Sequence, residues 1–148
     1  MKFELNIAAK EWKGFKPRPE IKKLIAAALA EIAKYEDIGL CEVSILLTND
    51  AAIQILNRDY RGFDKPTNVL SFPQDDDILL GDIAMAYETL EREAIEQDKT
   101  FHDHFTHLFV HGALHLLGYD HEEKHDQEDM EQQEIKILHG LGVENPYV

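Results

Sequence analysis

The sequence has little cysteine, no long apolar run and few basic residues. Its one cysteine, Cys41, cannot form an intramolecular disulfide, so we expect a reducing compartment, the cytoplasm. No run of about 18 apolar residues is present, which excludes a membrane-spanning helix, and we expect no signal peptide because no apolar segment follows the first residues. Lysine and arginine number 15 against 29 aspartates and glutamates, a formal net charge of −14. This charge repels nucleic acid at long range, although a bound dication and a few local bases can outweigh it within a Debye length of about 10 Å.

The pattern of apolar residues predicts short strands that alternate with helices. With 148 residues, the chain is long enough for one domain with a real core, and we predict a single domain over residues 1–148. Period-two or compact apolar segments predict strands at 3–7, 42–48, 69–72 and 82–86. Helices are predicted from residue 19 to the low thirties, over 50–60 with Ile53, Leu56 and Tyr60 facing inward, over 88–97, from a cap at Thr100 to a stop at Gly118, and over 122–139. No regular βαβ rhythm is present, so we expect one small mixed sheet with helices packed over it, an α+β or layered α/β domain.

The most informative segment is His111-Gly-Ala-Leu-His115-Leu-Leu-Gly118-Tyr-Asp-His121. Residues four apart on a helix lie on one face, so His111 and His115 can bind the same ion. Gly118 stands where a helix stop is expected, which lets the chain turn back and offer His121 as a third ligand. Three neutral imidazoles leave one coordination position of a zinc ion open, as in catalytic zinc sites; structural sites are closed by four ligands.

The same spacing of histidines and glycine occurs in metzincin proteases, but Gly112 stands where those proteases have a glutamate. That glutamate is the general base of peptide hydrolysis. The sequence therefore predicts a metal site without the peptidase base. An ion held there can polarise a phosphoryl oxygen or acidify a water.

Arg61 is the candidate catalytic residue outside the histidine segment. Its loop lies between a helix and a short strand, and a guanidinium forms a fork that suits phosphate. A metal with an arginine clamp is a suitable set of groups for phosphodiester cleavage. Further candidates are Lys65 as an assistant, Asp82 and Asp120 as carboxylates that orient a histidine, His107 as a neighbour of the site, and the bases of residues 10–23 as an RNA-steering surface. For the acidic last helix, for that basic stretch and for His102, His104, His125 and His139, an ordinary structural or solvated role is the simpler interpretation.

Three segments together resemble the YbeY family of bacterial ribosomal-RNA maturation factors. They are the histidine segment, Tyr60-Arg-Gly-Phe-Asp-Lys-Pro-Thr-Asn-Val-Leu-Ser-Phe-Pro73, and Leu79-Leu-Gly-Asp-Ile83. The resemblance runs from about residue 56 to the closing Asn-Pro-Tyr and keeps the order and spacing of all three segments. It implies a layered αβα sandwich with a small mixed sheet and a zincin-like metal helix. It further implies zinc ligands at His111, His115 and His121, a required arginine at Arg61, and glycine as the normal residue at position 112.

The activity that the resemblance implies is a single-strand-specific, zinc-dependent endoribonuclease. It would act in maturation of the 3′ end of the small-subunit (16S) ribosomal RNA and in ribosome quality control. The expected partners are single-stranded RNA, the small ribosomal subunit and a ribosome-associated GTPase, with no DNA and no membrane. Two other functions stay open: a metallohydrolase of peptides or small molecules, and a non-catalytic ribosome-assembly factor with a structural ion. A metal-bound water and the RNA 2′-hydroxyl both stay open as the nucleophile.

Overall fold

A computed structural model describes residues 2–39, 41–74, 76, 78–120 and 122–148. The elements follow the order β1 (Lys2–Ile7), a short 3₁₀ helix η1 (Lys10–Gly14), α1 (Arg18–Ala33), β2 (Glu42–Thr48), α2 (Asp50–Arg61), β3 (Val69–Pro73), β4 (Leu79–Ala86), α3 (Tyr87–Glu96), α4 (Phe101–Leu116) and α5 (Lys124–Gly140). None of the described helices combines the length and apolar character that crossing a bilayer requires.

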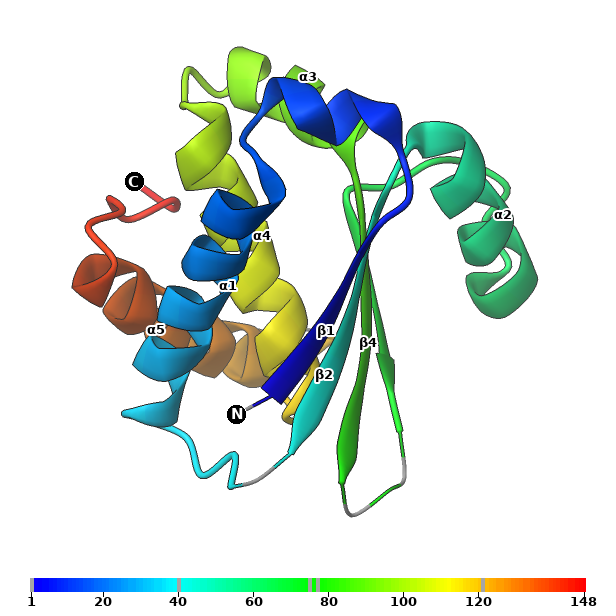
Figure 1. Ribbon diagram of the computed structural model, residues 1–148. Helices are drawn as coiled ribbons and strands as arrows, with labels where there is room; N and C mark the ends of the chain where they lie inside the picture. The colour runs from blue at the N-terminus through cyan, green and yellow to red at the C-terminus, as the bar shows by residue number, and fades with distance from the viewer. Residues whose placement is uncertain (1, 40, 75, 77, 121) are drawn as a thin grey trace.

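The four strands form one mixed sheet in the order β1-β2-β4-β3. β1, β2 and β4 are parallel, and β3 is an antiparallel edge strand on β4. α2 lies on one side of the sheet, and α1, α4 and α5 lie on the other (Figure 1). The predicted α+β class, with αβα layers around a small mixed sheet, is confirmed.

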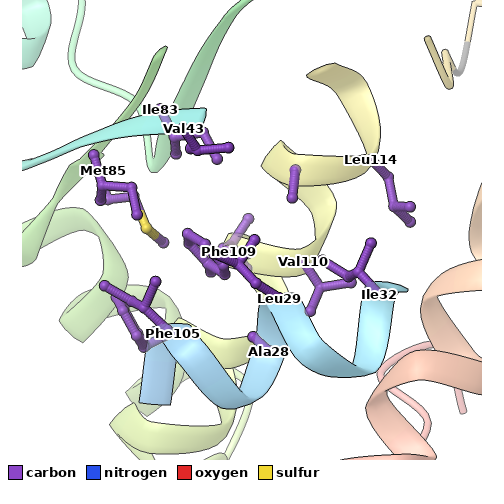
Figure 2. Packing of buried hydrophobic residues seen from close by; sticks show 14 of the residues in the cluster. Ala28, Leu29, Ile32, Val43, Ile83, Met85, Phe105, Phe109, Val110 and Leu114 are labelled. Atoms are coloured by element: carbon purple, nitrogen blue, oxygen red, sulfur yellow. The ribbon is translucent and has the colours of Figure 1, made fainter. Parts of the chain in front are cut away.

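α4 is the central helix of the core. It packs against α1, α3 and α5 as well as against β3 and β4. Its buried side chains, among them Phe105, Phe109, Val110 and Leu114, face apolar residues of α1 and of the sheet (Figure 2). Sequence analysis predicted a helix from Thr100 to a stop at Gly118, and the structure confirms it. A helix enclosed on several sides holds the residues it carries in fixed positions.

Two expectations were wrong: the burial of Tyr60 and the first residue of β4. Tyr60 is not buried but 69% exposed, because its ring contacts Phe72 of β3 at the side of an open groove and no further element of the described structure covers it. β4 begins at Leu79, three residues before the predicted start at Asp82. Leu79 pairs with Glu42 of β2, and the backbone N–H of Gln74 donates to the carbonyl of Leu80, so the hairpin with β3 extends further than alternation alone suggested.

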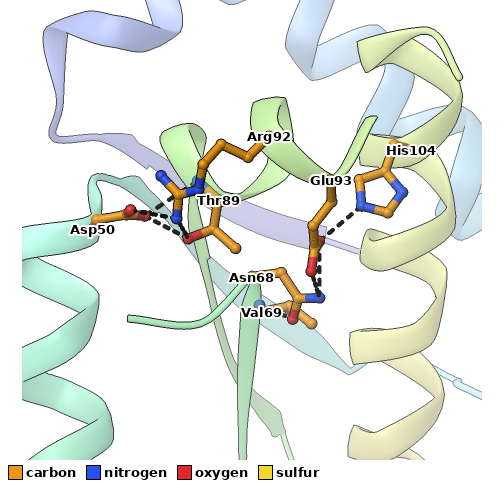
Figure 3. Close-up of polar contacts among 7 residues, drawn as sticks. All are labelled: Asp50, Asn68, Val69, Thr89, Arg92, Glu93 and His104. Carbon is orange, nitrogen blue, oxygen red and sulfur yellow. Dashed lines mark hydrogen bonds and ion pairs between the residues drawn. The ribbon is translucent and has the colours of Figure 1, made fainter. Parts of the chain in front are cut away.

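A polar network ties the loop before β3 to α3 and α4 (Figure 3). The amide of Asn68 donates to the Glu93 carboxylate at 3.1 and 3.2 Å, and its side-chain oxygen accepts from the backbone N–H of Val69 at 2.6 Å. Nε2 of His104 lies 2.9 Å from the same carboxylate. His104 thus has the ordinary structural role that we expected from the sequence. The network also fixes the position of the residue that precedes β3.

Candidate metal centre and the hollow beside it

His111 and His115 lie one turn apart on α4 and direct their rings to one point. Thr100 caps the helix by accepting a hydrogen bond of 3.1 Å from the backbone N–H of Asp103. The helix ends at Leu116, shortly before Gly118, which has a φ of 100° that disfavours residues with a Cβ. The two Nε2 atoms are 3.1 Å apart.

The other nitrogen of each ring is bonded to an oxygen. Nδ1 of His111 donates to Oε1 of Glu134 on α5 at 2.7 Å, and Nδ1 of His115 donates to the backbone carbonyl of Tyr119 at 2.9 Å. These acceptors place the proton of a neutral imidazole on Nδ1, so each Nε2 carries a lone pair. Two nitrogen lone pairs directed at one point are suited to bind a single cation there.

This donor set fits a zinc ion. Two nitrogens at the usual zinc distance of about 2.0–2.1 Å and at a tetrahedral angle lie roughly 3.3 Å apart. The observed separation of 3.1 Å between His111 and His115 is close to that value. Within the described part of the chain, no third histidine, cysteine or acidic side chain completes a metal-binding group with them. His121, the third predicted ligand, lies outside the described residues.

Glu134 is a fully buried carboxylate that supports His111 from behind. Its Oε2 accepts a hydrogen bond of 2.5 Å from the hydroxyl of Tyr147, and its Oε1 lies 3.5 Å from Nε2 of His107. Burial alone would raise the pKa of Glu134, but the hydrogen bonds from His107, His111 and Tyr147 lower it to about 2. Burial lowers the pKa of His107. At neutral pH Glu134 is therefore a carboxylate, and a carboxylate that accepts from Nδ1 of a histidine strengthens the binding of a cation at its Nε2.

Gly112 lies where α4 packs against the edge strand β3. A Cβ at this position would be 3.1 Å from both Ser71 Oγ and Val69 Cγ2, and 3.5 Å from Ile83 Cγ2. The hydroxyl of Ser71 donates to the carbonyl of Gly112 at 2.8 Å. A side chain at the position that carries a glutamate in metzincins would thus press tightly against the side chains of the sheet.

Arg61 and His115 line one hollow of about 460 Å³, which we call the histidine hollow; its lining includes Asn57, Arg61, Ser71, Pro73, His115 and Asp120. Arg61 is the last residue of α2, and Gly62, with a φ of 79°, ends the helix. The guanidinium donates to the backbone carbonyl of Ser71 and lies 5.3 Å from the ring centre of Phe72. β3 therefore bridges the arginine and the histidine helix, because Ser71 contacts both.

The structure distributes the remaining candidates differently. Asp82 accepts a bond of 3.3 Å from Gln74 on the α2 side of the sheet, and Asp120 accepts from the backbone N–H of Glu122 at 2.6 Å. In the described structure, Nδ1 of His111 and Nδ1 of His115 bond instead to Glu134 and to the carbonyl of Tyr119. Lys65 is exposed, with its ammonium 5.7 Å from the ring centre of Phe63.

The other charged segments are mostly solvated surfaces. Most bases of residues 10–23 are exposed, and none of them lines the histidine hollow. Residues 122–129 of the acidic segment are exposed as expected. Glu134 is the exception, and the interpretation of the last helix as a solvated face was wrong for this residue.

Glu134 and Tyr147 are the two site residues that sequence reasoning missed. A signal for Glu134 existed, because it lies four residues after Met130 and four before Leu138, both of which are buried. An acidic residue on the apolar face of a helix is rarely buried without a hydrogen-bond or ion-pair partner. Tyr147 offered no comparable pattern, since it lies outside any regular element.

The layers and the paired histidines define a small α+β protein with a candidate metal centre in the second half of its central helix. A sequence model of the family described as Endoribonuclease YbeY matches residues 6–142. A protein of that description from Bradyrhizobium sp. strain BTAi1 is 47% identical over 156 residues, covering 97% of this chain and 90% of its own length. Another from Bradyrhizobium diazoefficiens is 50% identical over 137 residues, covering 86% of this chain and 74% of its own length.

The fold has a solved counterpart as well. The solution structure of TM1509 from Thermotoga maritima superposes with a TM-score of 0.61 at 28% identity, covering 94% of this chain and 92% of that one. The family model and the two relatives show that the chain belongs to the YbeY family.

Proposed function

We propose that this protein is a single-strand-specific, zinc-dependent endoribonuclease. The observation that carries the proposal is the histidine hollow, in which Arg61 and His115 face the same space. A phosphate in that space would meet a guanidinium on one side and the metal centre on the other. Membership of a family described as an endoribonuclease supports RNA as the substrate.

The residues divide the work as follows. His111 and His115, with His121 as the third ligand, would hold zinc, which when bound supplies positive charge that stabilises the phosphoryl oxygens. Arg61 stabilises the negative charge that develops on the equatorial oxygens during cleavage. The attacking group is either a water or the 2′-hydroxyl of the RNA, and the two leave different ends.

The packing at Gly112 argues against a peptidase. A general base has to project from this turn of the helix toward the metal, and the neighbouring sheet leaves no room even for a Cβ without movement of Ser71 or Val69. Phosphodiester cleavage does not need a carboxylate there, because the charge to be stabilised can be met by cations.

We further propose that the RNA is the 3′ end of the small-subunit (16S) ribosomal RNA, cut in the cytoplasm during maturation and quality control. The formal net charge of −14 opposes capture of free RNA from solution. Contacts with the small ribosomal subunit, and with a ribosome-associated GTPase, would place the enzyme at its substrate despite that charge.

The test combines metal analysis with mapping of RNA ends. Native protein should contain about one zinc ion and cut single-stranded RNA, and His115→Ala should lose both properties. His125→Ala is the matched control, because His125 is an exposed histidine whose side chain is 82% accessible and bonded only to a nearby acid in the described structure. Cleavage by zinc-free His115→Ala at the wild-type rate would refute the proposal, because the activity would then not come from this site. The chemistry of the new ends identifies the attacking group.

A further inference from the structure

A second hollow lies on the α2 side of the sheet. It has a volume of about 710 Å³, and we call it the sheet-face groove; its lining includes Asn6, Ser44, Tyr60, Phe72, Gln74 and Asp82. α2 covers only one end of this side, where Ile53 packs on Leu70, Ala84 and Ala86. Figure 1 shows that the other end of the sheet has no helix over it on this side. Parallel strands are normally buried on both faces. The half of the sheet face that α2 leaves uncovered is therefore a candidate binding surface.

The wall of the groove carries an exposed but well-supported aromatic ring. Tyr60 is 69% exposed, and its ring meets the ring of Phe72 edge to face at 5.5 Å between centres. Phe72 is in turn covered by the guanidinium of Arg61 at 5.3 Å. An aromatic ring held in place with one face open is the usual platform for an unpaired base.

The groove is continuous with the proposed active site. Arg61 and Pro73 line both the sheet-face groove and the histidine hollow. β3 is the edge strand between the two hollows, and Arg61 lies across it with its guanidinium on the carbonyl of Ser71. A nucleotide chain whose phosphate meets Arg61 can therefore extend into both hollows.

We propose that the sheet-face groove binds one unpaired base of the RNA strand, adjacent to the phosphate at Arg61, with Tyr60 as its stacking partner. This inference rests on the proposed ribonuclease function. It gives a physical reason for single-strand specificity, because a base inside a duplex cannot turn its ring into the groove. It also supplies affinity that does not depend on the unfavourable net charge.

The floor of the groove fits a base better than a phosphate. Asp82 repels a phosphate, while its carboxylate can accept from the amino group of adenine, cytosine or guanine. The amides of Asn6 and Gln74 offer both donors and acceptors to a base edge. The Arg61 guanidinium at one end and the Asp82 carboxylate on the floor thus orient the nucleotide. Its phosphate would lie at Arg61 and its base on the sheet.

The test measures binding without cleavage. Chelator-treated protein is titrated with a fluorescent single-stranded RNA pentanucleotide, and the dissociation constant is determined from the fluorescence anisotropy. Tyr60→Ala should weaken binding about tenfold, the order expected for the loss of one stacked base, and Tyr60→Phe should retain binding within about twofold. Ser44→Phe, which fills the floor, should weaken binding similarly. Tyr35→Ala removes a partly exposed ring, 43% accessible and placed under Lys136, from outside both hollows and should change nothing.

Crosslinking gives a positional readout. RNA with 4-thiouridine in place of uridine should crosslink on irradiation to peptides that contain Tyr60 or Phe72. Wild-type affinity in both Tyr60→Ala and Ser44→Phe would overturn the inference and leave the proposed function intact, provided that zinc-loaded protein still cuts RNA. Variants that lose binding to ribosomes but bind the oligonucleotide normally would show a protein-docking surface and overturn it too. Wild-type protein that neither binds nor cuts RNA would overturn both.

Discussion

Ser71 on the edge strand and Gly112 on the central helix are in direct hydrogen-bonded contact, 2.8 Å from Oγ to the carbonyl oxygen. The contact joins the strand that carries the Arg61 bond to the helix that carries the histidines. It requires the helix to approach the sheet without a side chain between them. The distance between the arginine and the metal centre therefore depends on position 112 remaining a glycine.

Substitution of Gly112 should reveal how tight this approach is. Alanine gains about 1 kcal/mol of helix propensity over glycine, which offsets part of the crowding against Ser71 and Val69. Gly112→Ala should thus remain within about 1 kcal/mol of wild type, whereas Gly112→Glu should lose roughly 2–3 kcal/mol by overpacking. Urea unfolding measures both. A stable Gly112→Glu protein would show that the sheet can move away and that the packing argument against a peptidase is wrong.

Removal of the Glu134 carboxylate should weaken zinc binding more than it weakens the fold. Glu134→Gln keeps the size of the side chain but removes the charge that supports His111, and the loss of such an outer partner typically costs 10–100-fold in metal affinity. Competition with a coloured chelator measures the zinc affinity. Glu128→Gln, an exposed position on the same helix, is the control. Equal affinity in both variants would reduce Glu134 to a packing residue.

Arg61→Ala should separate catalysis from metal binding. The side chain is exposed and its bond to the Ser71 carbonyl is a single one, so the unfolding free energy should change by less than about 1 kcal/mol. Cleavage of single-stranded RNA should fall by about 10²–10³-fold, the order seen when one group that stabilises transition-state charge is removed. Zinc content should stay at the wild-type level. Loss of the metal in this variant would instead assign Arg61 a structural role.

The stability of the fold should decrease in acid through Glu93. Burial alone would raise the pKa of Glu93, but hydrogen bonds from His104 and Asn68 lower it below its usual value of 4.5 (Figure 3). A carboxylate with a lowered folded pKa stabilises the protein fully above the unfolded pKa and loses that contribution as pH falls through the folded pKa. Urea unfolding at several pH values should show Glu93→Gln less stable than wild type at pH 7. The gap should narrow below about pH 4.5, and a gap that widened in acid would contradict the assignment.

Local patterns predicted most of the elements. The spacing of the apolar residues in α1 and α4, the run of aliphatic residues in β2 and the cap at Thr100 are all properties of neighbouring residues, and all of them appear in the structure. The pair of histidines on one helical face belongs to the same class, because the geometry of one helix decides it.

Contacts between distant segments were beyond those patterns. Glu134 meets His111 from 23 residues away, and only the packing of α5 on α4 brings them together. The exposed position of Tyr60 depends on where α2 leaves the sheet, which periodicity along α2 does not encode. The contact of Ser71 with Gly112 spans 41 residues and likewise follows from the layers, although the glycine itself was visible in the sequence.

The bond from Arg61 to Ser71 also protects an open strand. Asn68 pairs with Ala86 and Gln74 with Leu80, so the residues between them at odd positions turn their backbone groups away from β4. Of these outward groups, the N–H of Val69 is bonded to the side chain of Asn68, the carbonyl of Ser71 accepts from Arg61, and Pro73 has no N–H. Each of these three positions thus has one backbone group that cannot bond to a fifth strand, which disfavours the addition of an extended peptide to β3, whether a substrate or a second copy of this chain.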